Sequence, residues 1–353
     1  MSNYYSVLRV HMSKPSRNLA SRAGRPLALA AVAAAALAAC GRPNAMGEAD
    51  SLILIADSAL WADMEYATYD ALEETLFTTR DEKKFHVTWV APGADEMNEL
   101  LLWRQVLVFG TPDDPLVAQA AEAAGRDALS PPELFQTPAV WATGQAVTAA
   151  VLEPGRERES WRALLPQVAE RLDRDYRAWT LDRMFVSGAD SAFAAELQER
   201  LGISLRVPNV YQTVFRDGDI ALIRNDNPDP SELIRSILVQ RVAPRDTVTP
   251  MAFAAWRSDI DSTQYNVPQA FELDPRHTRP VAVGGAEGIE VRGTWRDEAA
   301  YPAGGLLIGR ALRCPDATYF IDAWLYSPNP RRGKWQFVMQ IEEILGSFRC
   351  AAP

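Results

Sequence analysis

The sequence predicts an α+β fold of mixed α/β character, made of two packed subdomains. Strand and helix patterns alternate over residues 51–187, whereas strand patterns dominate residues 188–353. A strand meander near the end of the chain is followed by an apolar helical pattern that closes the second subdomain. A chain of this length suffices for two modest domains or for one larger domain with a substantial core.

The first subdomain, residues 51–187, begins with Leu52–Ala56 (LILIA), an apolar run that indicates a strand covered on both faces. A helix is expected next, because large apolar residues recur at helical spacing from Trp61 to Leu76. Further strands are predicted at 85–90 and 105–110, with a strand or strand pair within 140–152. The clearest amphipathic helix spans Glu157–Phe185, with one apolar stripe from Trp161 to Trp179.

The second subdomain, residues 188–353, follows a break in the pattern at Ser187–Asp190 (SGAD). Strands are predicted at 205–215, 220–224 and 234–242, and the Asp-Gly pair at 217–218 indicates a hairpin between the first two. A short helix is expected at Pro250–Ile260. The meander comprises 288–295, 306–313 and 319–326, and the closing helix runs from about Arg332 to Phe348.

Residues 1–39 have the pattern of a bacterial lipoprotein signal peptide. A basic segment without acidic residues precedes an apolar run, Leu27–Ala39, that is shorter than the roughly 20 residues needed to span a bilayer. The run ends in Leu-Ala-Ala-Cys, after which a dedicated peptidase would cut before Cys40 and leave its thiol lipidated. Translation from Met1 and from Met12 both stay open. We predict Cys40 as the lipidation site and the lipid as the link to a membrane.

The predicted mature chain is strongly acidic. Removing five basic signal residues from 36 leaves 31 against 46 acidic residues, a formal charge of −15. Such a surface is repelled by phosphate backbones and anionic headgroups, so no nucleic-acid partner is expected. Residues 40–50 are polar and aperiodic, which is typical of a tether. Gly41, in place of Asp after the cysteine, favours the outer over the inner membrane by the sorting rule for this class.

Several segments resemble the DUF4837 family of envelope lipoproteins, which has no assigned function. The resemblance is carried mainly by RLGISLRVPNVYQTV (200–214), IEVRGTWRDE (289–298), AGGLLIGR (303–310) and the stretch from Phe320 to Arg349. It is weaker in the first half, at LILIAD (52–57) and VWATGQAVTAAV (140–151). The resemblance implies a periplasm-facing envelope protein and lends no mechanism.

The sequence contains no catalytic signature, and we predict neither a metal nor a cofactor. His86 lies in a strand pattern and His277 in a stretch of loop composition (DPRHTRP), far from each other in sequence. The oxygen-rich segment Asn225–Asp229 is compatible with calcium, but its prolines suit a plain turn better. A glycine cluster at 284–288 is a weak phosphate signal, because a strand is expected to follow.

One cluster of aromatic and basic residues is a candidate ligand site. If the meander pairs as predicted, several of its members share a face near the last helix, where guanidinium groups over indoles suit a sugar or a peptide. The alternative is that these aromatics are core residues. The candidate residues are Arg292, Trp295, Trp324, Tyr326 and Lys334, with Trp335 beside them.

Two cysteines remain once Cys40 is assigned to lipid. Cys314 lies at a turn of the meander and Cys350 follows the closing helix, so that a helix folded across the sheet brings them together. Export to an oxidising compartment favours a disulfide, and the alternative is two buried thiols.

Two functions from different classes are compatible with the sequence. The first is a lipid-anchored, non-enzymatic binding or assembly module with an envelope protein or glycan as partner. The second is a hydrolase that acts on an envelope glycan or peptide through two facing carboxylates.

Overall fold

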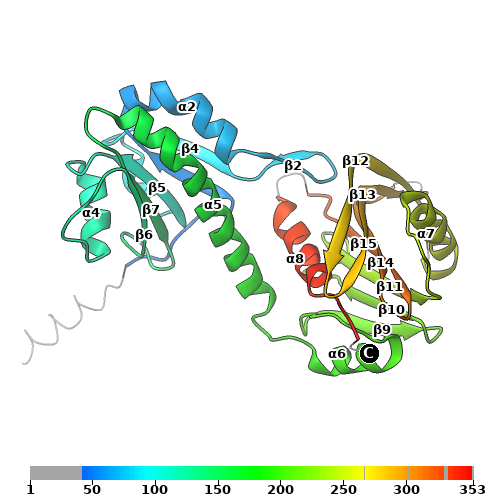
Figure 1. The fold of residues 1–353 in the computed structure, drawn as a ribbon. Coiled ribbons are helices and arrows are strands. Elements are labelled where there is room, and N and C mark those ends of the chain that lie inside the picture. Colours follow the sequence, from blue (N-terminus) through cyan, green and yellow to red (C-terminus); the bar gives the residue numbers. More distant parts are fainter. Residues whose placement is uncertain (1–41, 266, 300–301, 330–332, 352–353) are drawn as a thin grey trace, which may run out of the picture. The chain divides into compact units, whose positions relative to one another are not determined.

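The computed structural model describes residues 42–265, 267–299, 302–329 and 333–351 (Figure 1). The predicted signal peptide and Cys40 lie outside these ranges. The predicted α+β class is confirmed, and the span Asn44–Pro353 is one compact unit. Within the described ranges, no helix combines the length and the apolar character needed to cross a membrane.

Folded structure begins earlier than the predicted tether of residues 40–50 allows. Ala45 N donates to Thr143 O at 2.9 Å and Arg104 N donates to Met46 O at 2.7 Å. Asn44 and Met46 form isolated bridges with Thr143 and Trp103. The backbone from Asn44 onward therefore belongs to the fold, since its polar groups are paired with the first subdomain.

The first subdomain is a five-stranded sheet between helices, in the order β4-β1-β5-β7-β6. All neighbouring strands are parallel except the β6–β7 pair. Leu52 and Leu54 of β1 pack with Trp61 of α2 and Trp161 of α5, while Ile53 packs with α4 on the opposite face, which explains the uninterrupted apolar run. The elements are β1 (Ser51–Ile55), α2 (Ser58–Leu72), β2 (Thr75–Phe77), β3 (Asp81–Lys83), β4 (His86–Val90), α3 (Met97–Leu100), β5 (Gln105–Gly110), α4 (Pro115–Ala123), β6 (Glu133–Pro138), β7 (Ala146–Val151) and α5 (Glu157–Met184).

The second subdomain is built on a seven-stranded antiparallel sheet, in the order β12-β13-β14-β15-β11-β10-β9. The predicted meander is β13-β14-β15, and the Asp-Gly turn joins β9 to β10, with Asp217 and Gly218 at positive φ. The elements are α6 (Ser191–Leu201), β8 (Ile203–Ser204), β9 (Gln212–Arg216), β10 (Ile220–Asn225), β11 (Ile234–Val242), α7 (Pro250–Gln264), β12 (Gln269–Val283), β13 (Ala286–Asp297), β14 (Gly304–Arg313), β15 (Thr318–Tyr326), α8 (Trp335–Gly346) and β16 (Arg349–Cys350).

The loop assignment of His277 is wrong, because this residue lies within β12, the edge strand of the larger sheet. The sequence of β12 lacks a regular alternation of apolar and polar residues and contains Pro275 and Pro280. An edge strand tolerates proline because one of its sides makes no hydrogen bonds to another strand. The register with β13 shifts between Asp274 and Arg279. Because of this irregularity, the sequence pattern of β12 does not indicate a strand.

Two helices cover opposite faces of the larger sheet. Val338, Ile341 and Leu345 of α8 pack in one cluster with strand residues such as Ile308 and Ile321. Phe253, Trp256 and Ile260 of α7 pack on the other face, against Leu238, Val291 and Phe320. We call these the α8 face and the α7 face.

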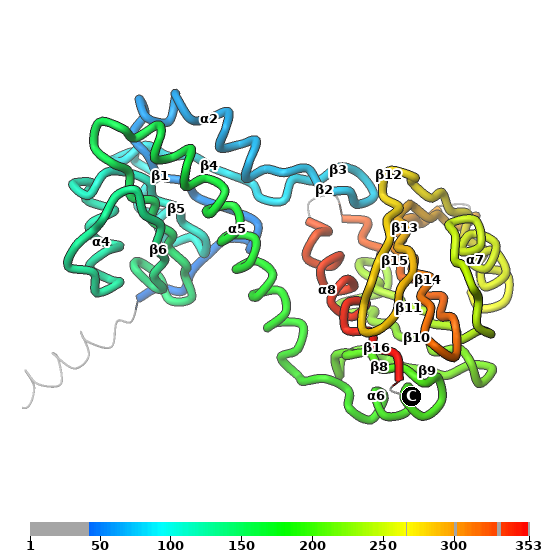
Figure 2. The backbone as a smooth tube through the Cα atoms, in the orientation of Figure 1, coloured from blue at the N-terminus to red at the C-terminus, as the bar shows by residue number. Residues whose placement is uncertain are grey.

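The disulfide predicted between Cys314 and Cys350 is present, with Cα atoms 5.8 Å apart. Cys314 follows β14, and Cys350 lies in β16, which pairs with β8 near the end of the described chain (Figure 2). Cys350 N also donates to Gly284 O at 3.0 Å in the β12–β13 turn. The bond therefore links the segment after α8 to the connection between β14 and β15.

Candidate functional site

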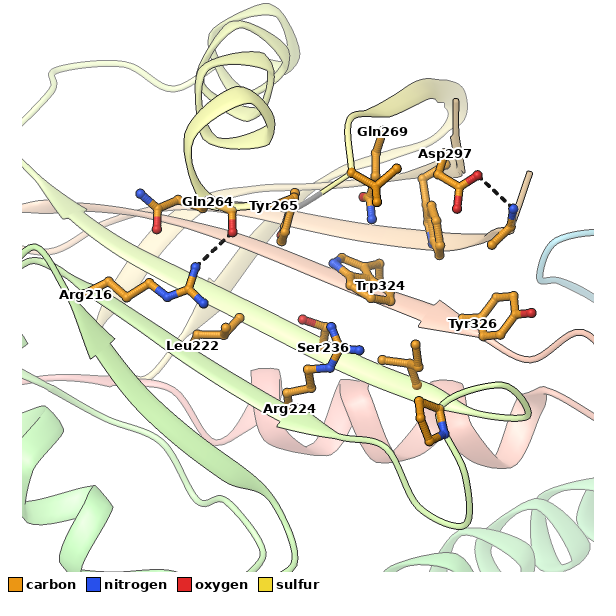
Figure 3. A pocket seen from close by; sticks show the side chains of 15 residues that line it. Arg216, Leu222, Arg224, Ser236, Gln264, Tyr265, Gln269, Asp297, Trp324 and Tyr326 are labelled. Atoms are coloured by element: carbon orange, nitrogen blue, oxygen red, sulfur yellow. Dashed lines mark hydrogen bonds between the residues drawn. The ribbon is translucent and has the colours of Figure 1, made fainter. Parts of the chain in front are cut away.

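The candidate site is a pocket on the α7 face, beyond the part of the sheet that α7 covers. Helix α7 lies over Leu238 and Phe320, whereas Ser236 and Trp324, further along the same face, are opposite each other in the β11–β15 register. The pocket there measures about 410 Å³, within the range of small-molecule sites (Figure 3). We call it the Trp324 pocket.

The floor of the Trp324 pocket is aromatic. Trp324 and Trp295 have ring centroids 4.9 Å apart and retain only 4% and 5% of their exposure. With Leu307 they form a small core cluster, and Trp295 Nε1 donates to Leu325 O at 3.3 Å. Both indoles are thus core residues that also line the pocket, while the half-buried Tyr326 completes this end.

Arginine and serine side chains from β9, β10 and β11 line the opposite wall. The Arg224 guanidinium lies 5.7 Å from the Trp324 ring centroid, and its Nε donates to Asp226 Oδ1 at 2.7 Å. Arg216 Nη1 donates to Gln264 O at 2.9 Å. Ser236 is 1% exposed, and its hydroxyl has no hydrogen-bond partner among the described residues.

A buried ion pair supports the wall formed by the end of α7. Arg257 and Asp322 are both 0% exposed, and Arg257 Nε donates to Asp322 Oδ1 at 3.1 Å. Tyr265 Oη donates to the second carboxylate oxygen at 2.7 Å, and Arg257 Nη2 donates to Gln269 Oε1 at 2.9 Å. Tyr265 and Gln269 line the pocket, so the pair holds two lining side chains in place.

This environment keeps Tyr265 protonated. Burial raises the pKa of the phenol well above its usual value, and the adjacent Asp322 carboxylate raises it further, while Arg257 and the Trp324 indole act in the opposite direction. Tyr265 is therefore a neutral hydrogen-bond donor to Asp322 at physiological pH.

The structure brings together only part of the predicted aromatic and basic cluster. Trp295, Trp324 and Tyr326 share the α7 face, as the register of β13, β14 and β15 requires. Arg292 is three residues from Trp295 in the same strand and therefore points to the other face, because side chains alternate along a strand. There it donates to Glu342 Oε1 at 2.6 Å.

Lys334 and Trp335 also lie away from the Trp324 pocket. Lys334 is buried beside α8, and its Nζ donates to Glu82 Oε1 at 2.8 Å. Trp335 begins α8, with the Arg177 guanidinium 5.6 Å from its ring centroid. Three of the six residues thus line the pocket. Because side chains alternate along a strand, the odd spacing between Arg292 and Trp295 in β13 already indicates that they lie on opposite faces.

Sequence reasoning missed the basic wall of the pocket. Arg224 and Ser236 are directly opposite in the β10–β11 register, and Ser236 is opposite Trp324 in the next pair. The hairpin at 217–218 fixes only the β9–β10 register, in which Arg224 is opposite Gln212, so it gives no signal for the pairing of Arg224 with Ser236. No local signal places Tyr265 and Gln269, which depend on how α7 docks.

The α8 face carries a second buried carboxylate, Glu290. Its Oε1 accepts from Arg279 and Arg292 and its Oε2 from Arg310, at 2.8–3.2 Å. Burial acts to raise the pKa of Glu290, but these guanidinium groups outweigh it and lower the pKa below its usual value. A neighbouring cavity of about 620 Å³ is lined by several arginine and lysine side chains. Their charges are paired with Glu290 or with Glu74, Asp274 and Glu342.

Side chains suited to metal binding do not converge in the described ranges. No set of three His, Cys, Asp or Glu residues is placed to hold a metal there. In the Asn225–Asp229 segment, Asn225 Oδ1 accepts from Asn227 N and Asp229 Oδ1 from Ser231 N, as in a plain turn. The described lining of the Trp324 pocket contains one carboxylate, Asp297, which accepts from Ala303 N at 3.0 Å.

Fold and pocket together define an α+β protein with a ligand-sized cavity on one face of an antiparallel sheet. No family model and no curated protein matches the chain. Among solved structures, cyanobacterial PsbP from Synechocystis sp. PCC 6803 is similar at 11% identity and a TM-score of 0.28, over 42% of this chain and 86% of that one.

A second similar structure is LpqN, described as involved in cell envelope biogenesis of Mycobacterium tuberculosis. It matches at 11% identity and a TM-score of 0.29, over 42% of this chain and 83% of that one. A protein from Bacteroides thetaiotaomicron VPI-5482 matches at 7% identity and a TM-score of 0.25, over 43% and 46% of the two chains. Similarities of this size carry no argument about function.

Proposed function

We propose that this chain is a lipid-anchored cell-envelope protein of the DUF4837 family that binds an envelope glycan through the Trp324 pocket. The signal pattern and Cys40 support the anchor, and the Cys314–Cys350 disulfide fits an exported protein in an oxidising compartment. Gly41 supports the outer membrane as its final location.

The observation that carries the binding role is the uncovered end of the α7 face. The sheet continues beyond α7, yet its side chains there leave a pocket of about 410 Å³ instead of a packed core. The lining combines aromatic rings with amide, hydroxyl and guanidinium groups, which match the two requirements of a sugar, an apolar ring face and an equatorial set of hydroxyls. The pocket lies on the sheet face, whereas an extended peptide would be expected to add to a sheet edge.

The anchor is tested by metabolic labelling with a fatty-acid analogue followed by membrane fractionation. The wild-type chain should carry label and sediment with membranes, whereas Cys40→Ser should carry none and should be released or accumulate as a precursor. An unlabelled, freely soluble wild-type protein contradicts the anchor.

Binding is tested by retention of the detergent-solubilised full chain on immobilised envelope glycan. Tyr326→Ala should reduce retention at least tenfold, because it removes one side of the pocket from a half-buried position. Tyr66→Ala is the matched control, since Tyr66 is 84% exposed on α2 and outside the pocket lining. Equal retention of the two variants contradicts the binding role.

A further inference from the structure

We infer that the Trp324 pocket is specific for a sugar that bears a carboxylate, and that Arg224 binds this carboxylate. The inference rests on the proposed function and names the ligand class for the same pocket. It is carried by the charge of the lining, by the unused donors of Arg224 and by a buried hydroxyl beside them.

The lining of the pocket is basic although the chain as a whole is acidic. Its described members include two guanidinium groups, Arg216 and Arg224, and a single carboxylate, Asp297. Asp297 Oδ1 is already occupied by the backbone N–H groups of Ala299 and Ala303. A negative group on a ligand therefore meets two guanidinium groups, of which Arg224 is paired with Asp226 through Nε, and one carboxylate whose Oδ1 already accepts from a turn.

Arg224 presents the part of its guanidinium group that recognises carboxylates. Its contact with Asp226 uses Nε, and neither terminal nitrogen donates to any described residue. The two terminal nitrogens form a planar fork that matches the two oxygens of a carboxylate. The guanidinium group lies 5.7 Å from the Trp324 ring centroid, on the wall of the pocket that faces the aromatic floor.

Ser236 adds a second donor at the same place. It is opposite Arg224 on β10 and opposite Trp324 on β15, on one face of three adjacent strands. Its hydroxyl is buried without a partner among the described residues, an arrangement that is unfavourable until an acceptor arrives. A ligand oxygen held by Arg224 supplies that acceptor, so the carboxylate and the hydroxyl satisfy each other.

The remaining lining suits the sugar ring that carries the carboxylate. Figure 3 shows Tyr265, Gln269 and Asp297 on one side of Trp324, with Arg224, Ser236 and Leu222 on the other. Gln269 Oε1 accepts from Arg257 Nη2, which orients the amide so that its nitrogen is left to donate. The ring hydroxyls thus meet a fixed amide while the carboxylate points to Arg224.

The test compares glucuronate with glucose, which differ in a carboxylate, by saturation-transfer NMR on the detergent-solubilised full chain. Glucuronate should bind at least tenfold more tightly than glucose. Arg224→Gln should remove this preference, and Ser236→Ala should weaken glucuronate binding several-fold. Arg296→Gln is the matched control, because Arg296 is an exposed arginine next to Trp295 that points to the opposite face of β13.

The other possible outcomes contradict either this inference alone or the proposed function as well. Equal binding of glucose and glucuronate overturns the carboxylate specificity and leaves the proposed glycan binding intact. Tighter binding of glucose 6-phosphate than of glucuronate also overturns it, in favour of a phosphorylated sugar. If immobilised envelope glycan does not retain the wild-type chain at all, the proposed function and this inference both fail.

Discussion

At the scale of single residues, two buried carboxylates organise opposite faces of the same sheet. Asp322 lies under α7 and Glu290 under α8, and both are 0% exposed. Each is neutralised by arginine, because an ionised carboxylate without a partner is too costly to bury. One carboxylate supports the wall of the Trp324 pocket and the other joins β12, β13 and β14.

Asp322→Asn should destabilise the fold by about 3–5 kcal/mol, since it leaves Arg257 as an uncompensated buried charge. Urea unfolding monitored by circular dichroism measures the change. The matched control is Glu196→Gln, which removes an exposed ion pair of similar length, 3.0 Å against 3.1 Å, and should cost under about 1 kcal/mol. Equal effects would contradict the role of burial.

Glu290 predicts a pH dependence with a defined sign. Because its folded-state pKa lies below the usual value of 4.5, the carboxylate stabilises the fold above that pH and loses this effect as the pH falls through the folded-state pKa. Glu290→Gln should therefore be less stable than wild type at pH 7, and this difference in the free energy of unfolding should narrow as the pH falls below 4.5. A gap that is constant from pH 7 to pH 3 would contradict this.

At the scale of elements, the sequence predicts two kinds of element best. These are strands that are apolar throughout because both faces are covered, and helices with a single apolar stripe. β1 and β5 are uninterrupted apolar runs between helices, and α5 carries one buried stripe, so all three are found where they were predicted. Strand β12 and helix α6 were missed. β12 is an edge strand with two prolines, while α6 is short, although Asp190 caps its start and Gly202 its end.

The residues of the Trp324 pocket could likewise be predicted only in part from the sequence. Its aromatic floor could be predicted because Trp324 and Tyr326 are two residues apart in one strand. Arg257 and Gln269 could not, because their positions follow from how α7 packs on the sheet and from the turn into β12. Arg292 was predicted on the wrong face of the sheet, because it is an odd number of residues from Trp295. The register of β13 with β14 places it on the α8 face.

The docking of α7 depends on Gly309. A Cβ there would lie 2.1 Å from Phe253 Cζ, so Gly309→Ala should push α7 from the sheet, destabilise the fold by about 1–3 kcal/mol and weaken ligand binding. Gly346→Ala in α8 is the control, since nothing lies within 4 Å of its Cβ and alanine favours the helix by up to about 1 kcal/mol. Thermal unfolding of both variants measures this contrast.

The disulfide should stabilise the end of the chain against unfolding. Cys314 and Cys350 are separated by 36 positions, for which the chain-entropy model gives roughly 4 kcal/mol. Reduction of the wild type, or Cys350→Ser, should lower the urea midpoint. The double variant Cys314→Ala/Cys350→Ala should be insensitive to reductant, and two free thiols titrated in the unreduced, unfolded wild type would contradict the bond.

At the scale of the whole molecule, the acidic surface and the basic pocket have opposite effects on an anionic ligand. The formal charge is −10 for the full chain and would be −15 without the five basic residues of the predicted signal peptide. Long-range repulsion is screened by salt more strongly than contacts inside a pocket. The same surface disfavours anionic headgroups, so the proposed attachment to a membrane depends on the proposed lipid at Cys40.

The residue after the anchor should then decide which membrane holds the protein. In a cell with two membranes, wild type should fractionate with the outer membrane, because Gly41 is not an inner-membrane retention signal under the sorting rule for lipoproteins. Gly41→Asp should move it to the inner-membrane fraction, and Gly41→Ser, a change of similar size without charge, should not. All three should take up the fatty-acid label equally, so a shift reports sorting and not acylation. Recovery of wild type and Gly41→Asp in the same fraction would show that Gly41 does not determine the location.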